Sequence, residues 1–425
     1  MKKSIIFLYI DVVLFFLLIF GFYITPFINS SLLVPIIIIF LNLLNKNRFN
    51  SIILNFISNK NIITIIFFFL FSVLIATCIP ILHQTFDFSY IANFASQLIQ
   101  LVCIIFFISF ILCHKKEKIS DYFEKVLIYA FLVQSIIQIL SFLFSSFANF
   151  IHIFYLDYEI INLYERSGKI RGLALASSTG WGLSVGYACT FLFFTKHYLI
   201  SKKINFFTLL LGLTLFIGCF FSGRTAFVGV LLSLVYYFIS EKKGKFKDFI
   251  YVLSFFILIT FFFLTFMQLY NSQIIDKLIN FAFEPIVNYF NSGKLETSST
   301  NTLLNMWDRE FTLETYIFGD GLFTDPTSGK YYMLTDVGYL RNLFYGGIFW
   351  ILIIAFYHII ISGLLMKKKS QKKQNILIIF LLIFSFLIEF KAMSLGFNKY
   401  LFTILLTYYL SIIADNYTNR IYQND

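Results

Sequence analysis

The chain has 425 residues, of which 59% are hydrophobic, 21% aromatic and only 13% charged, and its mean hydropathy is +0.82. This balance excludes an ordinary soluble protein, because so few polar side chains could not cover the surface of a chain of this length. The formal net charge is +11, but the Lys and Arg residues form short clusters between apolar runs, which argues against a nucleic-acid partner.

Apolar runs long enough to cross a bilayer recur along the whole chain. In lipid every backbone amide must be satisfied internally, so the sequence predicts an all-α, polytopic membrane protein, with residues 1–425 forming a single transmembrane helical domain. About twelve spans are predicted, at 4–24, 30–45, 62–82, 94–113, 126–147, 173–194, 205–222, 224–240, 248–269, 341–365, 375–393 and 397–414.

The positive charges are unevenly distributed between the two sides of this predicted bundle. Loops on the side of the N-terminus contain 22 Lys and Arg residues, and loops on the other side contain 11, of which five lie within 277–341. Positive residues are retained on the cytoplasmic side of a membrane. The sequence therefore predicts cytoplasmic termini, a short external segment at 148–172 and a large external loop at 270–340.

Three arginines lie on the external side, where positive charge is otherwise selected against. Arg171 precedes the predicted span 173–194, Arg224 follows Ser222 and Gly223, and Arg341 begins the predicted span 341–365. An arginine at such a place can extend its stem along apolar surface toward the lipid headgroups, and this interpretation stays open for each one. Together they predict anion binding, because a guanidinium binds phosphate through two parallel hydrogen bonds.

Three further charged residues lie near the external ends of the late spans. Glu389 and Lys391 are two residues apart, so on a helix they point in different directions. Each could pair with a charge on a neighbouring helix, or Glu389 could be catalytic. Asp336 precedes Arg341 by five residues in a turn that contains glycine. It could act as a base, remain an ordinary turn carboxylate or orient Arg341, and we favour the last role.

The sequence predicts no metal site and no cofactor. The external histidines, His83 and His152, have no second His or Cys at ligand spacing. The long loop 270–340 contains no histidine. The chain has no Walker A sequence, no GxGxxG and no GxSxG, so nucleotide hydrolysis and serine acyl transfer find no support.

Several motifs, taken in order, resemble the O-antigen polymerase (Wzy) family. They are Arg171-Gly-Leu, Ser222-Gly-Arg-Thr-Ala-Phe227, Phe318-Gly-Asp-Gly321, Thr335-Asp-Val-Gly-Tyr339 and Gly346-Gly-Ile348. Twelve spans, cytoplasmic termini and a large late external loop agree with this family, so the resemblance covers most of the chain.

The resemblance implies a membrane glycosyltransferase of the bacterial inner membrane. Its substrates would be undecaprenyl-pyrophosphate-linked oligosaccharides, which it would join into a surface polysaccharide such as O-antigen without a metal ion. Arg171, Arg224, Arg341 and Lys391 would bind the pyrophosphate, and Asp336 or Glu389 would be catalytic. A flippase and a chain-length regulator are partners of such an enzyme. Two alternatives are an O-antigen ligase, expected to carry a functional histidine in its long external loop, and a non-enzymatic lipid-linked oligosaccharide flippase or transporter.

Overall fold

The computed structural model describes residues 2–43, 46–115, 118–156, 158–201, 205–240, 254, 265, 284, 287–294, 296–366, 372–396 and 398–421. In this part the chain is almost entirely helical, and its one sheet is a two-stranded antiparallel hairpin. The chain forms two compact units, each assembled from segments that are far apart in sequence. Unit 1 comprises residues 1–31 and 124–297, and unit 2 comprises residues 32–123 and 298–425.

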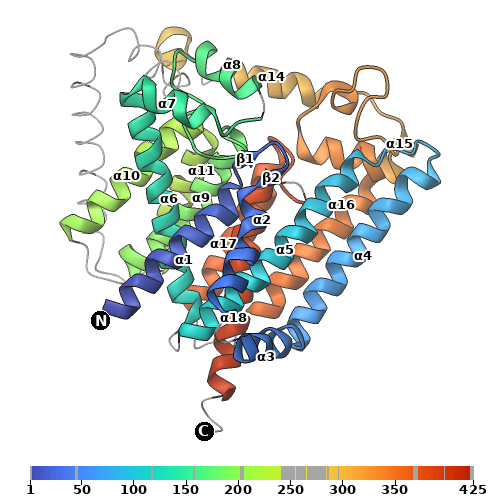
Figure 1. Ribbon diagram of the computed structural model, residues 1–425. Helices are drawn as coiled ribbons and strands as arrows, with labels where there is room; N and C mark the ends of the chain where they lie inside the picture. The colour runs from blue at the N-terminus through green and yellow to red at the C-terminus, as the bar shows by residue number, and fades with distance from the viewer. Residues whose placement is uncertain are drawn as a thin grey trace. The chain divides into compact units, whose positions relative to one another are not determined.

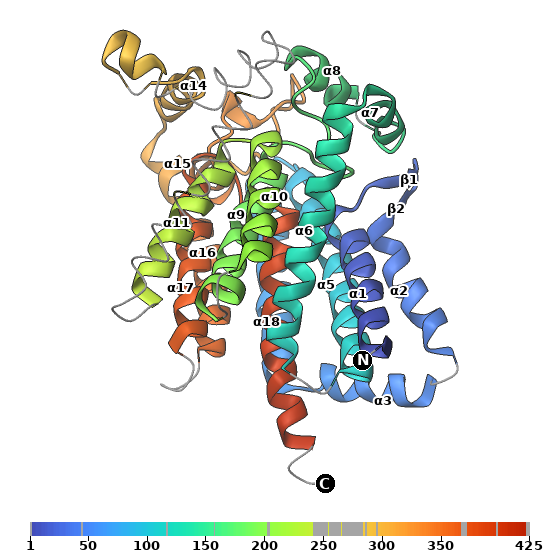
Figure 2. The same ribbon diagram turned by 90° about the vertical axis from the view of Figure 1, so that its left-hand side faces the viewer.

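Unit 1 contains helices from the first and the middle parts of the chain. Its helix α9 packs against both α10 and α11, and the three run side by side in Figure 2. Gly229 of α11 allows this, because a Cβ atom there would lie 2.3 Å from Ala188 of α9. The elements are α1 (Lys2–Phe20), β1 (Tyr23–Thr25), β2 (Ile28–Asn29), most of α6 (Ile119–Leu143), α7 (Ser145–His152), α8 (Tyr158–Arg166), α9 (Trp181–Phe194), the π-helix η2 (Thr195–Ile200), α10 (Phe206–Ser222) and α11 (Thr225–Ser240).

Unit 2 is built around long helices from the early and late parts of the chain. Helix α16 packs against α4, α15 and α17, and α5 packs against α18 and α3. Figure 1 shows α4, α5 and α16 running alongside one another. The elements are most of α2 (Ser30–Leu41), α3 (Lys46–Ile57), α4 (Lys60–Leu82), α5 (Ser89–His114), α14 (Ser298–Trp307), α15 (Leu313–Phe318), η3 (Tyr332–Leu334), α16 (Gly338–Leu365), α17 (Lys372–Glu389) and α18 (Lys399–Ile421).

Helix α16 is kinked at Gly346 and Gly347, where α15 lies directly against it. The kink residue Gly347 has a φ of +66°, and a Cβ atom there would come within 2.1 Å of the Ile317 carbonyl oxygen. Only glycine permits this backbone conformation together with this approach. The kink therefore lets the loop that follows α15 reach the first turns of α16, and the amide of Asp320 donates a hydrogen bond of 2.6 Å to the Phe344 carbonyl.

Four helices of the described residues are long and apolar enough to cross a membrane, namely α4, α5, α6 and α16. Shorter apolar helices occur at 5–20, 30–41, 206–222 and 225–240. The prediction of about twelve crossings is thus supported only for four helices, and all of the predicted span 248–269 except residues 254 and 265 lies outside the described residues.

One predicted span begins later than the apolar pattern indicated. Residues 173–180 are not helical, and α9 starts only at Trp181, after Gly180 with φ −101° and ψ −119°. The run of Ser177, Ser178 and Thr179 before Gly180 explains the difference, since short hydroxyl side chains compete with helical hydrogen bonds. The segment 148–172 is also not a plain loop, because it contains α8 and the end of α7.

The π-helix η2 continues α9 and contains a buried charge cluster in unit 1. The Lys196 ammonium forms an ion pair with the Glu124 carboxylate of α6. The second carboxylate oxygen lies 3.3 Å from Nδ1 of His197. A π-helix advances the side chains of successive residues differently from an α-helix, which brings both basic residues to one acidic partner.

Candidate functional site

Arg171 and Arg224 approach each other at the turn between α10 and α11. The Nη2 atom of Arg171 lies 4.0 Å from the place that a Cβ atom on Gly223 would occupy, next to Arg224 in sequence. Burial lowers the pKa of the Arg171 guanidinium, and the positive charge of Arg224 lowers it further. Two neighbouring guanidinium groups repel each other, so a bound anion would stabilise this part of unit 1.

The turn before Arg224 depends on Gly223. Its amide ends α10 by donating to the Cys219 carbonyl at 3.1 Å, and its own carbonyl accepts from the Ala226 amide at 3.1 Å. The φ of Gly223 is +145°, and a Cβ atom there would lie 2.8 Å from the Ser184 hydroxyl oxygen. Glycine is therefore required for the sharp turn and for its close contact with α9.

Arg171 is positioned by the segment between α6 and α9. Its amide donates to the Ser167 hydroxyl at 3.0 Å. The next carbonyl, that of Gly172, lies 3.1 Å from Nε2 of His152 and accepts from the Tyr155 hydroxyl at 3.0 Å. Burial lowers the pKa of His152, which favours its neutral form. The apolar cluster beneath this turn consists of Ala148, Tyr164, Ile170, Leu173 and Phe221.

Arg224 forms an ion pair with Glu284. The closest nitrogen and oxygen lie 2.8 Å apart, and the two side chains are only 20% and 23% exposed. Glu284 belongs to the predicted external loop 270–340. The pair shows that a carboxylate fits against the Arg224 guanidinium, which is the geometry expected of a site for an oxyanion.

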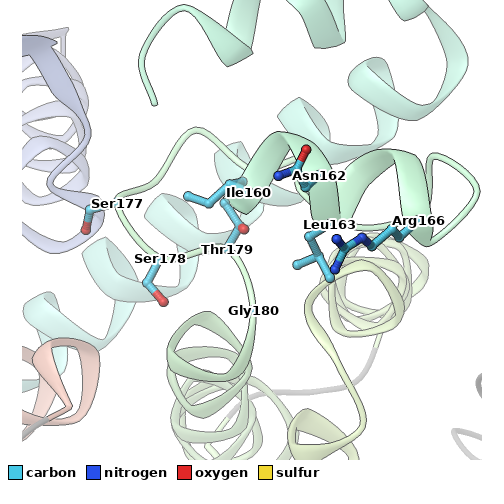
Figure 3. A pocket seen from close by; sticks show the side chains of 8 residues that line it. All are labelled: Ile160, Asn162, Leu163, Arg166, Ser177, Ser178, Thr179 and Gly180. Atoms are coloured by element: carbon cyan, nitrogen blue, oxygen red, sulfur yellow. The ribbon is translucent and has the colours of Figure 1, made fainter. Parts of the chain in front are cut away.

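A cavity of about 460 Å³ lies in the same unit, between α8 and the segment that leads into α9. Figure 3 shows α8 on one side of it and the segment 177–180 on the other. Gly180 at its edge accepts a 3.1 Å hydrogen bond from the Ser184 hydroxyl, the group that touches Gly223. The cavity and the arginine pair are thus linked through one turn of α9. The lining residues are Ile160, Asn162, Leu163, Arg166, Ser177, Ser178, Thr179 and Gly180.

In unit 2, the Arg341 guanidinium lies against two aromatic rings. Its guanidinium carbon lies 3.9 Å from the centre of the Phe323 ring and 3.6 Å from that of Tyr331. A β-bridge between Thr324 and Tyr331 brings the two rings together. The two rings are inclined by 63° to each other, so they enclose the guanidinium from two directions, and the Arg341 side chain is buried, with an exposed fraction of only 4%.

Glu389 is fully buried and accepts hydrogen bonds from two elements of unit 2. One carboxylate oxygen accepts from the Asn342 side-chain amide at 2.8 Å. The other accepts from the backbone amides of Ser394 and Leu395, at 2.7 and 2.9 Å, and from the Ser394 hydroxyl at 2.5 Å. Asn342 follows Arg341 directly, so Glu389 ties the turn after α17 to the first turns of α16.

Asp336 and Lys391 are both exposed, in contrast to Glu389. Asp336 lies in the turn before α16, where its amide is 3.5 Å from the Met306 sulfur. Its negative charge acts favourably on the Arg341 guanidinium. The opposite exposure of Glu389 and Lys391 agrees with the prediction that they point in different directions.

The six predicted residues therefore fall into two groups. Arg171 and Arg224 meet in unit 1, whereas Arg341, Asp336, Glu389 and Lys391 belong to unit 2. Among the described residues, no three His, Cys, Asp or Glu side chains gather as a metal site would require.

Sequence reasoning missed the partners that hold these residues. The sequence carries no signal that singles out Tyr331, Asn342 or Glu284 as partners. Uncharged polar and aromatic residues are common in this chain, and Glu284 is one of many acids in its loop. Asp87 was also missed. Its carboxylate accepts from the amides of Phe323 and Thr324, both at 2.7 Å, and so holds the loop that covers Arg341.

Comparison with known proteins adds no relative to this description. No protein-family model matches the chain, and no curated protein and no solved structure matches it. A functional proposal therefore depends on the sequence motifs and on the geometry of the two groups of residues.

Proposed function

We propose that the protein is a membrane glycosyltransferase that joins undecaprenyl-pyrophosphate-linked oligosaccharide repeat units into a surface polysaccharide. The observation that supports it best is the approach of Arg171 to Arg224 around Gly223, with a carboxylate already seated against Arg224. Two guanidinium groups suit a pyrophosphate, which carries its charge on several oxygens. The motifs that resemble O-antigen polymerases contain both arginines.

In the proposed reaction a hydroxyl oxygen of the acceptor sugar forms a bond to the anomeric carbon of the donor chain. The bond from that carbon to the pyrophosphate oxygen breaks, and undecaprenyl pyrophosphate leaves with the electron pair. Arg171 and Arg224 stabilise the negative charge that develops on the leaving group. Arg341 and Lys391 are further candidates for this role.

The acceptor hydroxyl must also lose its proton. Asp336 and Glu389 are the two candidate proton acceptors. Asp336 is exposed in the turn before α16, whereas Glu389 is fully buried and already accepts four hydrogen bonds. A base must come within hydrogen-bonding distance of the proton that it removes. Asp336 therefore suits contact with a substrate better, and Glu389 suits a positioning role.

The proposal places the protein in the bacterial inner membrane. Helices α4, α5, α6 and α16 are long and apolar enough for four crossings, and in the proposal the other predicted spans bring the number to about twelve, with both termini in the cytoplasm. Reporter enzymes fused within 270–340 should behave as external, and fusions in 241–247 or 367–373 as cytoplasmic. A cytoplasmic result for 270–340 would contradict both the orientation and the external site.

Reconstituted protein provides the test of activity. Purified protein in liposomes, supplied with radiolabelled lipid-linked repeat units, should produce a ladder of lipid-linked oligomers and release undecaprenyl pyrophosphate. An Arg171→Ala, Arg224→Ala double variant should produce none, and Arg48→Ala, which changes an exposed arginine of α3, should match the wild type. Transfer of sugars to lipid A without a ladder would favour a ligase instead, and movement of the lipid across the bilayer without new glycosidic bonds would favour a flippase.

A further inference from the structure

The cavity beside α8 has two chemically different walls. Arg166, at the end of α8, contributes a guanidinium, and Ile160 and Leu163 of the same helix contribute apolar surface. The opposite wall is the run Ser177, Ser178, Thr179 and Gly180. Figure 3 shows these two walls facing the same space.

The hydroxyl wall is well ordered by the rest of unit 1. The Ser177 amide donates a 2.9 Å hydrogen bond to the Phe20 carbonyl at the end of α1. Thr179 is only 3% exposed, and Gly180 is held by α9 through Ser184. A wall fixed at both ends can present its hydroxyl groups in a defined geometry, which a ligand site requires.

The chemistry of the lining indicates what kind of ligand fits. Ser and Thr hydroxyls and the Asn162 amide both donate and accept hydrogen bonds, so they match the hydroxyl groups of a sugar. A pyrophosphate only accepts, and it would leave the acceptors of this wall unmatched. Ile160 and Leu163 suit the apolar faces of sugar rings. A volume of about 460 Å³ falls within the range of pockets that hold small organic ligands, enough for a short oligosaccharide segment.

Arg166 adds one positive charge to this otherwise neutral lining. One role of its positive charge is to interact favourably with the negative, C-terminal end of the α8 dipole. Its position in the cavity gives it a second one, since a guanidinium binds a carboxylate through two parallel hydrogen bonds.

We propose that the cavity binds the carbohydrate portion of an anionic glycan and that Arg166 recognises a carboxylate on one of its sugars. This inference rests on the proposed function, because it names the class of oligosaccharide that the enzyme takes. The glycan lies along the hydroxyl wall, and the link through Gly180 and Ser184 leads from it to the arginine pair at Gly223.

Binding to purified full-length protein in nanodiscs tests the inference. The probes are trigalacturonic acid, maltotriose and inorganic pyrophosphate, with affinities measured by saturation-transfer nuclear magnetic resonance. Trigalacturonic acid should bind about three- to fivefold more tightly than maltotriose, the effect of one ion pair to the exposed Arg166. Arg166→Gln should remove this preference while leaving maltotriose binding unchanged.

Two further variants separate recognition from simple charge. Arg166→Lys keeps the charge and the helix-dipole effect but loses the planar fork, so it should retain only part of the preference. Thr179→Val removes a buried hydroxyl at nearly constant volume and should weaken both sugars alike. Lys169→Asn, at an exposed position with a φ of +69° that asparagine accepts, is the charge control and should change nothing.

Several results would overturn the proposal. The wild type could bind neither sugar or bind both equally. Arg166→Gln could keep the preference for trigalacturonic acid. Pyrophosphate could displace trigalacturonic acid in a manner that depends on Arg166. Because the readout is binding and not turnover, a sugar preference without polymer formation would retain this inference and reject the polymerase. Polymer formation without the sugar preference would support the polymerase and reject this inference.

Discussion

Glu284 places a carboxylate oxygen 2.8 Å from a guanidinium nitrogen of Arg224. A ligand that brings an anionic group to Arg224 must therefore compete with an anion that the chain itself supplies. The carboxylate neutralises the charge of Arg224 when no ligand is bound. A more highly charged anion such as pyrophosphate is better able to displace it than a singly charged one.

The first prediction concerns this competition. Glu284→Gln removes the negative charge and should raise the affinity of the purified protein for inorganic pyrophosphate about fivefold, since a partly exposed ion pair contributes about 1 kcal/mol. Calorimetric titration in detergent provides the measurement. The control is Glu296→Gln, because Glu296 lies 3.8 Å from Lys294 with both side chains at least half exposed. Equal affinities in the two variants would show that Glu284 does not compete.

Arg224→Lys distinguishes anion binding from headgroup contact. A pyrophosphate bound through two parallel hydrogen bonds should be lost with the fork, so this variant should lose most polymer formation although it keeps the charge, and Arg224→Ala should lose essentially all. The measurement is the length distribution of surface polysaccharide in a deletion strain at matched protein level, with Arg48→Lys as the control. Full-length polymer from Arg224→Lys would identify a residue that only extends to the headgroups. The same comparison applies to Arg171 and Arg341.

Two substitutions of Asp336 distinguish a residue that orients Arg341 from a general base. An amide oxygen still accepts a hydrogen bond, so Asp336→Asn should keep part of the activity if the carboxylate orients Arg341. Loss of a general base costs about a hundred- to ten-thousand-fold, which would shorten the product to one transferred repeat. We expect partial activity in Asp336→Asn and less in Asp336→Ala. Abolition by both changes would assign the base to Asp336, and long polymer from both would make it an ordinary turn residue.

Glu389 should matter for stability before it matters for chemistry. Replacement by Gln sets a side-chain NH2 group against the donors of Ser394 and Leu395, and one buried mismatched group costs about 1–3 kcal/mol. We expect Glu389→Gln to lower the unfolding temperature in detergent, with activity per folded molecule largely kept. Normal thermal stability combined with lost activity would instead identify Glu389 as the proton acceptor.

Asp87 should make stability depend on pH. Burial raises the pKa of its carboxyl, but hydrogen bonds from Ser89, Thr324 and Phe323 outweigh this and lower it below 3.8. A carboxyl with a lowered pKa in the folded state stabilises the fold above its unfolded pKa of about 3.9, and this stability is lost as the pH falls through the folded pKa. Asp87→Asn should thus lower the unfolding temperature at pH 7 by a few degrees.

The pH series is the decisive part of this experiment. The difference between wild type and Asp87→Asn should begin to shrink as the pH falls below about 4, because the carboxyl of the unfolded chain takes up a proton there, and it should be lost below the lowered pKa of the folded state. A difference that stays constant over this range would show that the carboxylate charge contributes nothing and that only shape matters at this position.

The helices could be predicted from the sequence where one physical signal dominates. The apolar run at 62–82 is bounded by polar residues, and α4 extends over Lys60–Leu82. The start of α9 could not be predicted, because Leu173 and Ala174 have the same hydrophobicity whether they belong to a helix or pack in a loop. There the Tyr155 hydroxyl binds the Ala174 carbonyl at 2.5 Å, a contact between residues nineteen positions apart.

The candidate site, like the helices, could be predicted from the sequence only in part. The unusual positions of Arg171 and Arg224 were visible from charge distribution alone. Their approach depends on Gly223 and on the packing of α10 against the segment before α9, which no spacing in the sequence encodes. The contact of Arg341 with two aromatic rings depends likewise on a β-bridge between Thr324 and Tyr331, two residues that carry no local signal for pairing.

The interleaved make-up of the two units has a consequence for biosynthesis. Unit 1 combines the first 31 residues with residues 124–297, and unit 2 requires α18 as a partner of α5. During synthesis about a hundred residues must therefore follow α1 before the rest of unit 1 emerges from the ribosome, and almost the whole chain must be made before α18 can pack against α5. Helices made early need temporary lipid or insertase contacts in that interval. A ribosome that stops after residue 297 would release a chain whose second unit lacks α14 to α18 and cannot complete its packing.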